Sequence, residues 1–191
     1  TQRTLARHPP ELAKLFLLQP GDRMMPLLPA FWLGGMAMAL EVISVGATLV
    51  YPDSPDINVV LDSIEALEVN RVNSWGDMLV KLRDAAVERD IDVDAIVGLG
   101  PFRDKSGALI PPQLQSNMLG MSETFAVHSA EPLDARLPEA KAGASGRTIN
   151  GYERRIVNPD TGTEVAVGEV GELLLRGGGL MSGLYKVTRE Q

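Results

Sequence analysis

Residues 35–51 read GMAMALEVISVGATLVY, which predicts a buried helix followed directly by a buried strand. Apolar residues occupy nearly every side of a helix from about Gly35 to Val45, so this helix should be covered on most sides. Gly46 supplies the glycine that commonly ends a helix. The continuous apolar run from Ala47 to Tyr51 is typical of a parallel strand that is covered on both faces.

The same alternation of helices and strands continues on both sides of this stretch. A short apolar run at Met24–Leu28 predicts a strand before it. Helical spacing of apolar residues predicts further helices at 57–68 and 77–89, and short apolar runs predict further strands at 69–73 and 95–99. Strands that alternate with helices imply right-handed crossovers. The predicted fold class is therefore α/β, with a parallel sheet flanked by helices as part of a large N-terminal domain.

After about residue 105 the sequence has a different character. Helical periodicity fades, glycine becomes frequent, and the turn signal Asn158–Gly162 separates two apolar runs. These runs predict antiparallel strands joined by hairpins. The stretch 133–144 is polar and contains proline, which suggests a boundary. We therefore expect an α/β subdomain over 1–140 and a smaller antiparallel β-rich subdomain over 141–191, both parts of one larger domain.

Composition excludes several classes of function. The 191 residues include no cysteine and two histidines, which excludes disulfides, thiolate metal sites and histidine-rich metal sites. The net charge is −7 and no cluster of Lys and Arg is present, so nucleic acid is not an expected partner. The apolar region 24–51 is interrupted by prolines and glycines, and Glu41 would lie near the middle of any membrane span. We therefore expect no transmembrane segment.

One segment combines groups that suit phosphate chemistry. In Asn117–Thr124 an apolar run ends in Gly120 and then presents the hydroxyl of Ser122 and the carboxylate of Glu123. A hydroxyl can hydrogen-bond a phosphate oxygen, Mg²⁺ takes only one or two protein carboxylates, and a glycine lets the backbone approach a nucleotide closely. The same residues are also typical of an ordinary strand exit with Ser122 as a helix cap, which is the preferred interpretation of this segment alone.

Two other segments carry weaker signals. Gly171–Tyr185 is an apolar strand that runs into a glycine-rich stretch and an aromatic residue. It lacks the Lys-Ser/Thr pair of a phosphate-binding loop, so a hairpin with a glycine-rich loop is the simpler interpretation. In Pro29–Gly35 two aromatics precede two glycines at a helix start. They could line a hydrophobic slot or simply pack in the core.

Taken together and in order, these segments resemble the acyl-activating (adenylate-forming) superfamily of fatty acyl-CoA synthetases, aryl-CoA ligases, luciferases and peptide-synthetase adenylation domains. Leu119–Glu123 resembles its Tyr-Gly-x-Thr-Glu motif, and Gly171–Tyr185 resembles its Gly-Glu-Leu…Arg-Gly…Gly-Tyr motif. Pro29–Gly35 is similar to its Pro-Leu-Phe-His…Gly segment, and Gly146–Val157 is similar to its Gly-Arg-Pro…Gly…Val stretch. The resemblance covers most of the chain from about Asp22 and is greatest to a fatty acyl-CoA synthetase.

The resemblance implies a role for each residue of the first motif. Ser122 stands where the family threonine contacts the α-phosphate, and Glu123 stands where the family glutamate helps to hold Mg²⁺. These two are the candidate catalytic residues, and Glu123 is the candidate metal ligand. Leu119, Gly120, Met121 and Ser122 are the candidate nucleotide-binding residues. Leu119 replaces the aromatic that packs on adenine in the family, so it offers no π face.

The resemblance also implies where the acid binds. Trp32 stands at the family position that borders the acyl channel, and Gly34 and Gly35 follow it, so these three are the candidate substrate-binding residues. Their apolar surroundings favour a fatty or similarly hydrophobic acid.

A reaction and its reactants are implied as well. The parent enzyme would be an acid–CoA ligase of cytoplasmic fatty acid metabolism that uses ATP, Mg²⁺ and coenzyme A to convert a carboxylic acid into an acyl-adenylate and then a thioester. The family's phosphate loop precedes the first motif, and its ribose-binding Asp and adenylation Lys follow the second. We therefore expect a central fragment of a longer enzyme, inactive by itself, with a homodimer as a possible assembly.

Alternative functions remain open. An aryl-acid ligase or a peptide-synthetase adenylation domain would keep the chemistry but change the acid, or replace coenzyme A by a carrier protein. A non-catalytic α/β binding module is a further alternative, which is supported mainly by Leu119 in place of the aromatic.

Overall fold

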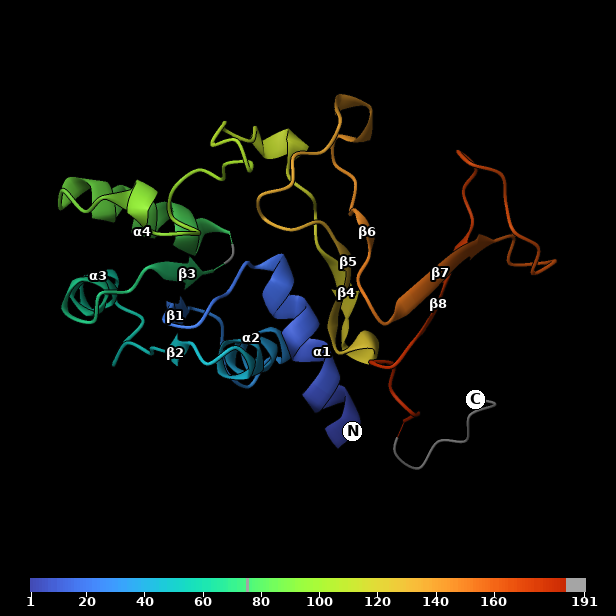
Figure 1. The fold of residues 1–191 in the computed structure, drawn as a ribbon, viewed down its shortest axis with the longest axis horizontal. Helices are drawn as coiled ribbons and strands as arrows, with labels where there is room; N and C mark the ends of the chain where they lie inside the picture. Colours follow the sequence, from blue (N-terminus) through green and yellow to red (C-terminus); the bar gives the residue numbers. More distant parts are fainter. Residues whose placement is uncertain (75, 185–191) are drawn as a thin grey trace.

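A three-stranded parallel sheet lies in the first half of the chain (Figure 1). The computed structural model describes residues 1–74 and 76–184. The strands are β1 (Arg23–Pro26), β2 (Thr48–Leu49) and β3 (Arg71–Asn73), in the order β2-β1-β3. Both neighbouring pairs are parallel, which confirms the predicted sheet type.

Three helices connect or flank these strands, as the hydrophobic periodicity predicts. They are α2 (Leu33–Ser44), α3 (Ile57–Ala66) and α4 (Asp77–Glu88). Gly46 follows α2 with a φ of 73°, which is the left-handed conformation that glycine adopts without strain. The Asp56 side chain caps α3 by accepting hydrogen bonds from two backbone amides of its first turn. The largest core cluster lies between the sheet and α3 and α4, and includes Met25, Leu61 and Leu82.

The helix α1 (Gln2–Leu15) begins well before the amphipathic stretch Glu11–Leu18, which is the helical signal in the polar, proline-containing first 20 residues. It runs through Pro9 and Pro10, which cannot donate the usual backbone hydrogen bonds. Burial compensates for this loss, since Pro9, Leu12 and Ala13 all lie in the interior. Figure 1 shows α1 in the centre of the molecule, beside α2 and between the parallel sheet and the antiparallel strands.

Two predicted strands differ from the structure. The run 47–51 forms only the two-residue β2 at the edge of the sheet. It is not covered on both faces, because Thr48 is exposed and Leu49 is only partly buried. In place of a strand at 95–99, Ala95 ends the 3₁₀ helix Val93–Ala95, and Val97 makes a single parallel bridge with Arg71. The strand cannot continue past Gly98, because the φ of 99° at this residue lies outside the range of extended backbone. Only glycine fits there, since a Cβ would lie 2.0 Å from the Val72 carbonyl oxygen.

The second half of the chain is antiparallel, as predicted. One sheet has the order β4-β5-β6, formed by β4 (Leu119–Met121), β5 (Ala126–Ala130) and β6 (Arg147–Thr148). A separate hairpin pairs β7 (Tyr152–Val157) with β8 (Glu172–Gly177). The remaining short 3₁₀ helices are Pro112–Leu114, Ser122–Thr124 and Glu139–Lys141. The first antiparallel strand is thus β4, and an isolated antiparallel bridge between Arg103 and Leu109 precedes it. The subdomain division after residue 140 stays a prediction.

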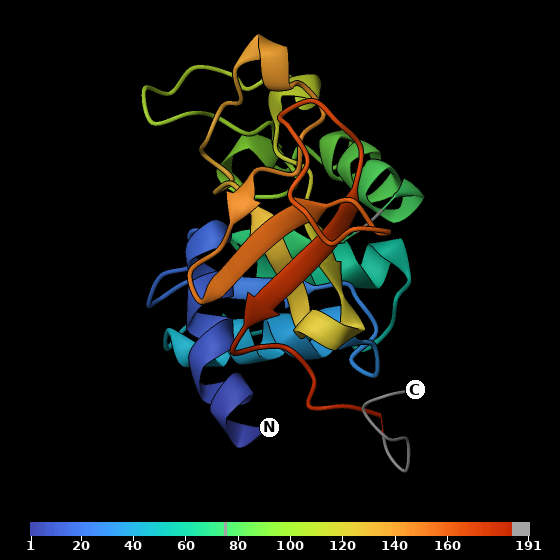
Figure 2. The ribbon, with the colours of Figure 1, turned by 90° about the vertical axis from the view of Figure 1, so that its right-hand side faces the viewer.

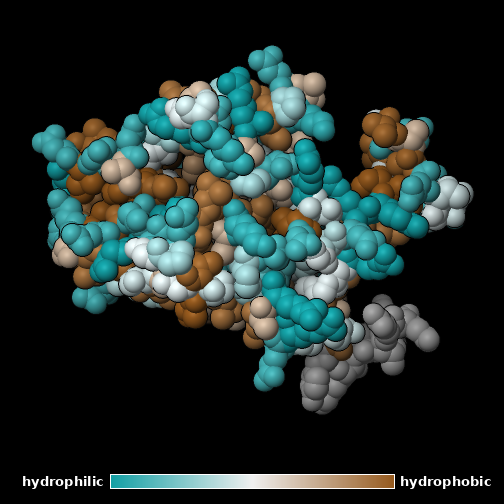
Figure 3. Space-filling model, in the orientation of Figure 1, coloured by the Kyte–Doolittle hydropathy of each residue, from teal (hydrophilic) through white to brown (hydrophobic). Residues whose placement is uncertain are grey.

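The β7–β8 hairpin projects from the rest of the molecule (Figures 1 and 2). Hydrophobic side chains gather on this projection in Figure 3, and Val167 and Val170 in its connecting loop are fully exposed. Among the described residues, no helix combines the length and the apolar character that crossing a bilayer requires.

Candidate functional site

The turn after β4 carries the predicted phosphate-binding residues and has an unusual backbone. It consists of the 3₁₀ helix Ser122–Thr124, followed by Phe125 with a φ of 50° and Ala126 with a φ of 73°. Two consecutive non-glycine residues with positive φ are strained, so the surrounding structure has to hold them in place.

Thr124 is the residue that holds this turn from inside. Its side chain is fully buried, and its hydroxyl oxygen lies 3.0 Å from the Met121 carbonyl and 2.8 Å from the Ala126 carbonyl. The same oxygen accepts a hydrogen bond from the Met121 amide at 3.2 Å. The hydroxyl therefore closes the loop from 121 to 126 on itself, a role that sequence reasoning did not assign to it.

Gly120 permits the close approach of β4 to β5. A Cβ atom at this position would lie 2.3 Å from the Ala126 carbonyl oxygen and 2.6 Å from the Val127 Cα. The register between the two strands shifts at this point. The need for glycine here therefore has a cause within the fold, in addition to the predicted approach of a nucleotide.

The remaining residues of the first motif face outward. Leu119, Met121, Ser122 and Glu123 are all exposed to solvent. Within the described part of the chain, the Glu123 carboxylate has no hydrogen bond or ion pair, whereas its backbone carbonyl accepts a hydrogen bond from the Met181 amide at 2.8 Å. The hydroxyl of Ser122 and the carboxylate of Glu123 are thus adjacent and free to meet a ligand.

The glycine-rich segment after β8 packs behind this turn. The Tyr152 hydroxyl donates a hydrogen bond to the Thr124 carbonyl at 2.5 Å, and burial raises the pKa of Tyr152 to about 12. A Cβ on Gly177 would lie 2.5 Å from the Tyr152 ring, and one on Gly179 would lie 1.8 Å from its hydroxyl oxygen. These glycines therefore make room for Tyr152. Tyr185, the last residue of the predicted motif, lies outside the described residues.

Two buried histidines pack on the same tyrosine. The His8 ring centroid lies 5.2 Å from that of Tyr152, and the His128 centroid lies 6.3 Å from it. The His8 Nε2 is 3.1 Å from the Val127 carbonyl, while the His128 Nδ1 is 2.9 Å from the Ser129 hydroxyl. Burial lowers the pKa of both histidines below 6.5, and the nearby Arg154 lowers that of His128 further.

The histidines are expected to make the chain less stable in mild acid. Between pH 6.5 and their lower folded-state pKa, the unfolded chain binds protons that the folded chain does not, so the free energy of unfolding falls as the pH falls. Urea midpoints of the wild type and of a His8→Asn/His128→Asn double variant should converge between pH 7.5 and 5.5. The double variant is needed because Glu41 has the opposite effect on stability. Its raised pKa makes the free energy of unfolding increase as the pH falls. A constant difference between the two proteins would contradict this expectation.

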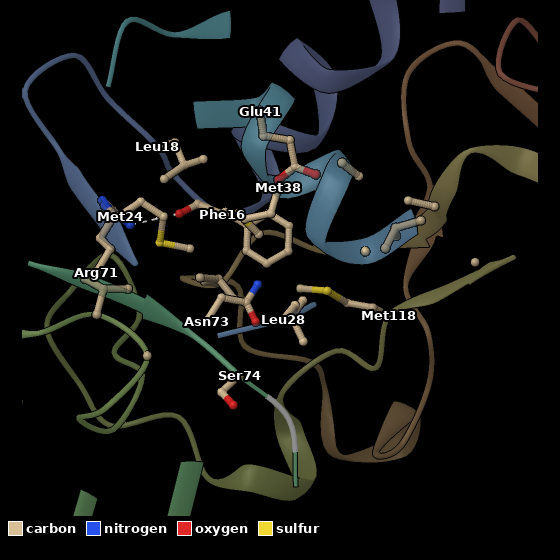
Figure 4. A pocket seen from close by; sticks show the side chains of 18 of the residues that line it. Phe16, Leu18, Met24, Leu28, Met38, Glu41, Arg71, Asn73, Ser74 and Met118 are labelled. Atoms are coloured by element: carbon tan, nitrogen blue, oxygen red, sulfur yellow. Dashed lines mark hydrogen bonds between the residues drawn. The ribbon is translucent and has the colours of Figure 1, made fainter. Parts of the chain in front are cut away.

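A cavity of about 590 Å³ lies between the parallel sheet, α2 and the antiparallel strands (Figure 4). Most of its lining is apolar, including Phe16, Leu18, Met24, Leu28, Met38 and Met118. Gly120, Met121 and Ser122 also line it, so the cavity extends to the turn described above.

The predicted substrate-binding residues are placed unequally around this cavity. Gly34 lines it. Trp32 lies outside the lining, with 58% of its surface exposed, and packs edge-on against the exposed Phe31. Gly35 also lies outside the lining, and a Cβ there would be 2.3 Å from the Pro29 carbonyl oxygen. The close packing of α2 on the preceding turn accounts for Gly35, while an acyl-binding role for Trp32 stays a prediction.

Three ionisable side chains that line the cavity, Glu41, Arg71 and Glu131, were not predicted as site residues. Arg71 pairs with Asp22 at 2.5 Å and donates hydrogen bonds to the carbonyls of Phe16 and Leu17. Glu41 is 2% exposed, and burial raises its pKa to about 8. Its position as the one charged residue in the apolar stretch 24–51 was the available signal.

The Ser122 hydroxyl and the Glu123 carboxylate suit a magnesium ion that arrives with a nucleotide, rather than a metal ion that protein side chains hold alone. No group of three or more His, Asp or Glu side chains comes together in the part of the chain that the structure describes. Mg²⁺ in nucleotide sites keeps several waters and needs only one or two carboxylates besides the phosphates. Glu123, whose carboxylate has no partner within the described residues, fits this requirement.

Comparison with known proteins identifies a related family. The AMP-binding enzyme family matches residues 4–185. The chain is 26% identical to 4-coumarate–CoA ligase-like 9 of Arabidopsis thaliana, over 82% of this chain and 29% of that protein. It is 26% identical to the sulfoacetate–CoA ligase of Cupriavidus necator, over the whole of this chain and 38% of that protein. The chain therefore spans roughly a third of the length of these relatives.

The fold is shared with solved structures. The crystal structure of a long-chain-fatty-acid–CoA ligase from Archaeoglobus fulgidus superposes with a TM-score of 0.69 at 19% sequence identity. The match covers all of this chain and 41% of that one. The parallel sheet with its helices and the antiparallel strands thus occur together in an enzyme more than twice as long.

Proposed function

Since the chain belongs to the AMP-binding enzyme family, we propose that it forms the acid-binding cavity and one face of the nucleotide site of an acid–CoA ligase. The observation that carries this proposal is that one continuous cavity extends from the apolar side chains of α2 and β1 to Gly120 and Ser122. A carboxylic acid in this cavity could place its carboxylate beside the turn while its apolar part stays buried. By itself, the 191-residue chain is not proposed to complete the reaction.

The reaction would be the joining of a carboxylic acid to coenzyme A through an acyl-adenylate. The carboxylate oxygen attacks the α-phosphorus of ATP, and the bond to the departing pyrophosphate breaks. The thiol of coenzyme A then attacks the acyl carbon and displaces AMP. Catalysis of this kind consists mainly of positioning and charge neutralisation.

The residues of the turn would serve these two tasks. The Ser122 hydroxyl would donate a hydrogen bond to an α-phosphate oxygen, and the Glu123 carboxylate would hold Mg²⁺. Bound Mg²⁺ supplies positive charge against the phosphates. Gly120 and Met121 would line the nucleotide with their backbone, and Leu119 would pack on the base. The strained backbone at Phe125 and Ala126 supports this assignment, because such strain is typical of ligand-binding turns.

The acid is proposed to be a fatty or other hydrophobic acid. The support is the apolar lining of the cavity, which includes Phe16, Leu18, Met24, Leu28 and Met38 (Figure 4). Burial of apolar surface contributes about 25 cal/mol per Å², so an alkyl chain would gain affinity along the whole cavity. A cytoplasmic location and a homodimer are further parts of this proposal that await measurement.

An aromatic acid is the second candidate, and the relatives favour it. The Arabidopsis protein that matches most of this chain is described as a 4-coumarate–CoA ligase-like enzyme. The sulfoacetate–CoA ligase among the relatives acts on a very different acid, so membership of the family leaves the acid open. Calorimetric titration of the chain with decanoate and with cinnamate would distinguish the two proposals.

The nucleotide part of the proposal predicts that ATP·Mg²⁺ binds weakly to this chain and that Glu123→Gln weakens binding by at least about ten-fold. Calorimetry in the presence and absence of Mg²⁺ measures this. Glu139→Gln is the matched control, because Glu139 is also an exposed glutamate in a 3₁₀ helix and lies away from the turn. Equal losses in both variants, or no loss in Glu123→Gln, would exclude Glu123 as the metal ligand.

A further inference from the structure

Glu41 is a buried acid whose carboxyl group has an oxygen without a partner among the described residues. It lies on α2, is 2% exposed, and lines the cavity. Its Oε2 atom has no hydrogen-bond partner among the described residues. In Figure 4 its carboxyl group extends from the helix toward the interior of the cavity, on the same side as Phe16 and Met38. A buried polar group without a partner is costly, so its presence calls for a group that comes from outside the chain.

Several charged groups of the surrounding elements have partners of their own: Arg71 pairs with Asp22, Lys14 pairs with Glu11, Glu131 pairs with Arg147, and Arg23 donates a hydrogen bond to the Leu67 carbonyl. Arg3 and Arg7 on α1 are exposed to solvent. His128 on β5 lies beside Ser129, and burial keeps it neutral at pH 7. Within the described part of the chain, Glu41 forms no ion pair. Burial alone raises its pKa to about 8, so the carboxyl group is protonated at neutral pH.

We propose that Glu41 determines the specificity of the cavity by hydrogen-bonding a hydroxyl group that the acid carries on its apolar part, away from its carboxylate. This inference rests on the proposed acid-binding role of the cavity. It narrows the substrate class from hydrophobic acids in general to hydroxylated ones.

The chemistry of the site favours a hydroxyl over a charged amine. A neutral carboxylic acid has one donor hydrogen and a carbonyl acceptor, and a hydroxyl can satisfy both. An amine would have to bring a positive charge into an apolar cavity, which costs far more than the transfer of a hydroxyl. A plain alkyl chain would leave Glu41 without a partner. Sites built around a buried polar group discriminate strongly against ligands that lack the matching group.

The test compares three acids of equal length: decanoate, 10-hydroxydecanoate and 10-aminodecanoate. Their dissociation constants for the 191-residue chain are measured by calorimetry at pH 7. The wild type should bind 10-hydroxydecanoate about five-fold more tightly than decanoate. Glu41→Leu should reverse this order, whereas Glu41→Gln should keep it, because the amide still donates and accepts hydrogen bonds. Circular dichroism checks that each variant is folded.

A pH series separates a role in recognition from a role in packing. Raising the pH from 7 to 9.5 ionises Glu41 and should weaken decanoate binding in the wild type but leave it unchanged in Glu41→Gln. Three outcomes would overturn the proposed role of Glu41 but leave the acid-binding cavity intact. They are equal binding of the three acids, tighter binding of the amine, and a preference for the hydroxyl that persists in Glu41→Leu. Failure of the wild type to bind any acid would overturn the acid-binding cavity as well.

Discussion

Replacing Gly120 with alanine is expected to lower the free energy of unfolding by about 3 kcal/mol and to displace the turn that carries Ser122 and Glu123. The new Cβ would lie 2.3 Å from the Ala126 carbonyl oxygen and 2.6 Å from the Val127 Cα. Both atoms belong to the backbone of β5, so no side-chain rotation can relieve the overlap. The strands β4 and β5 would have to separate, and the turn between them would move with them.

Urea unfolding followed by circular dichroism measures this effect. Gly178→Ala is the matched control, because a Cβ at Gly178 would meet nothing within 4 Å and its φ is not positive. That variant should stay within about 0.5 kcal/mol of the wild type. Weak ATP·Mg²⁺ binding should persist in Gly178→Ala and disappear in Gly120→Ala. Similar stabilities for the two alanine variants would show that β4 and β5 are less closely packed than described.

Replacing Tyr152 with alanine is expected to cost about 4 kcal/mol of stability. The ring fills the space among His8, His128, Gly177 and Gly179, and its hydroxyl holds the Thr124 carbonyl. Removing it leaves a cavity and an unpaired carbonyl at the strained turn. Tyr152→Phe removes only the hydrogen bond and should cost about 1 kcal/mol.

The two tyrosine variants distinguish packing from hydrogen bonding. Thermal unfolding gives the stability of each, and hydrogen exchange of the Met121 and Phe125 amides reports on the turn. Tyr51→Ala is the control, because that tyrosine is 45% exposed and lies outside the three core clusters. A loss in Tyr51→Ala as large as that in Tyr152→Ala would contradict the assignment of Tyr152 as the support of the turn.

Local signals predicted most of the helices and the hairpin. The positive φ at Gly46 and the side-chain cap from Asp56 depend on residues within one turn of the helix ends, so the sequence contains them directly. The hairpin of β7 and β8 follows in the same way from the turn signal at Asn158–Gly162 and its flanking apolar runs.

Elements that depend on distant residues were predicted less well. The helix α1 survives two internal prolines because it is buried against α2 and the antiparallel strands, and the local amphipathic pattern begins only at Glu11, after both prolines. The predicted strand at 95–99 looked apolar enough, but Gly98 turns the chain where a side chain would meet the Val72 carbonyl.

The candidate site shows the same division between local and distant effects. The adjacency of Ser122 and Glu123 is fixed by their neighbouring positions, and the structure adds only that both are exposed. The position of Glu41 in the same cavity depends on how α2 packs against β1 and β5. The hydrogen bond from Tyr152 to Thr124 joins residues that are 28 positions apart in the chain, so their spacing in the sequence alone could not predict it.

The central position of α1 has a consequence for how this protein is made. Thr4 in its first turn hydrogen-bonds the carbonyl of Gly178, a residue 174 positions later, and His8 contacts the carbonyl of Val127. At a translation rate of about 5 to 20 residues per second, a ribosome needs about 10 to 35 s to deliver the last of these partners. During that interval the apolar side of α1 lacks its final neighbours. Exposed apolar side chains can bind chaperones or cause aggregation. Production of this protein should therefore depend strongly on chaperone supply and on slow, cool expression.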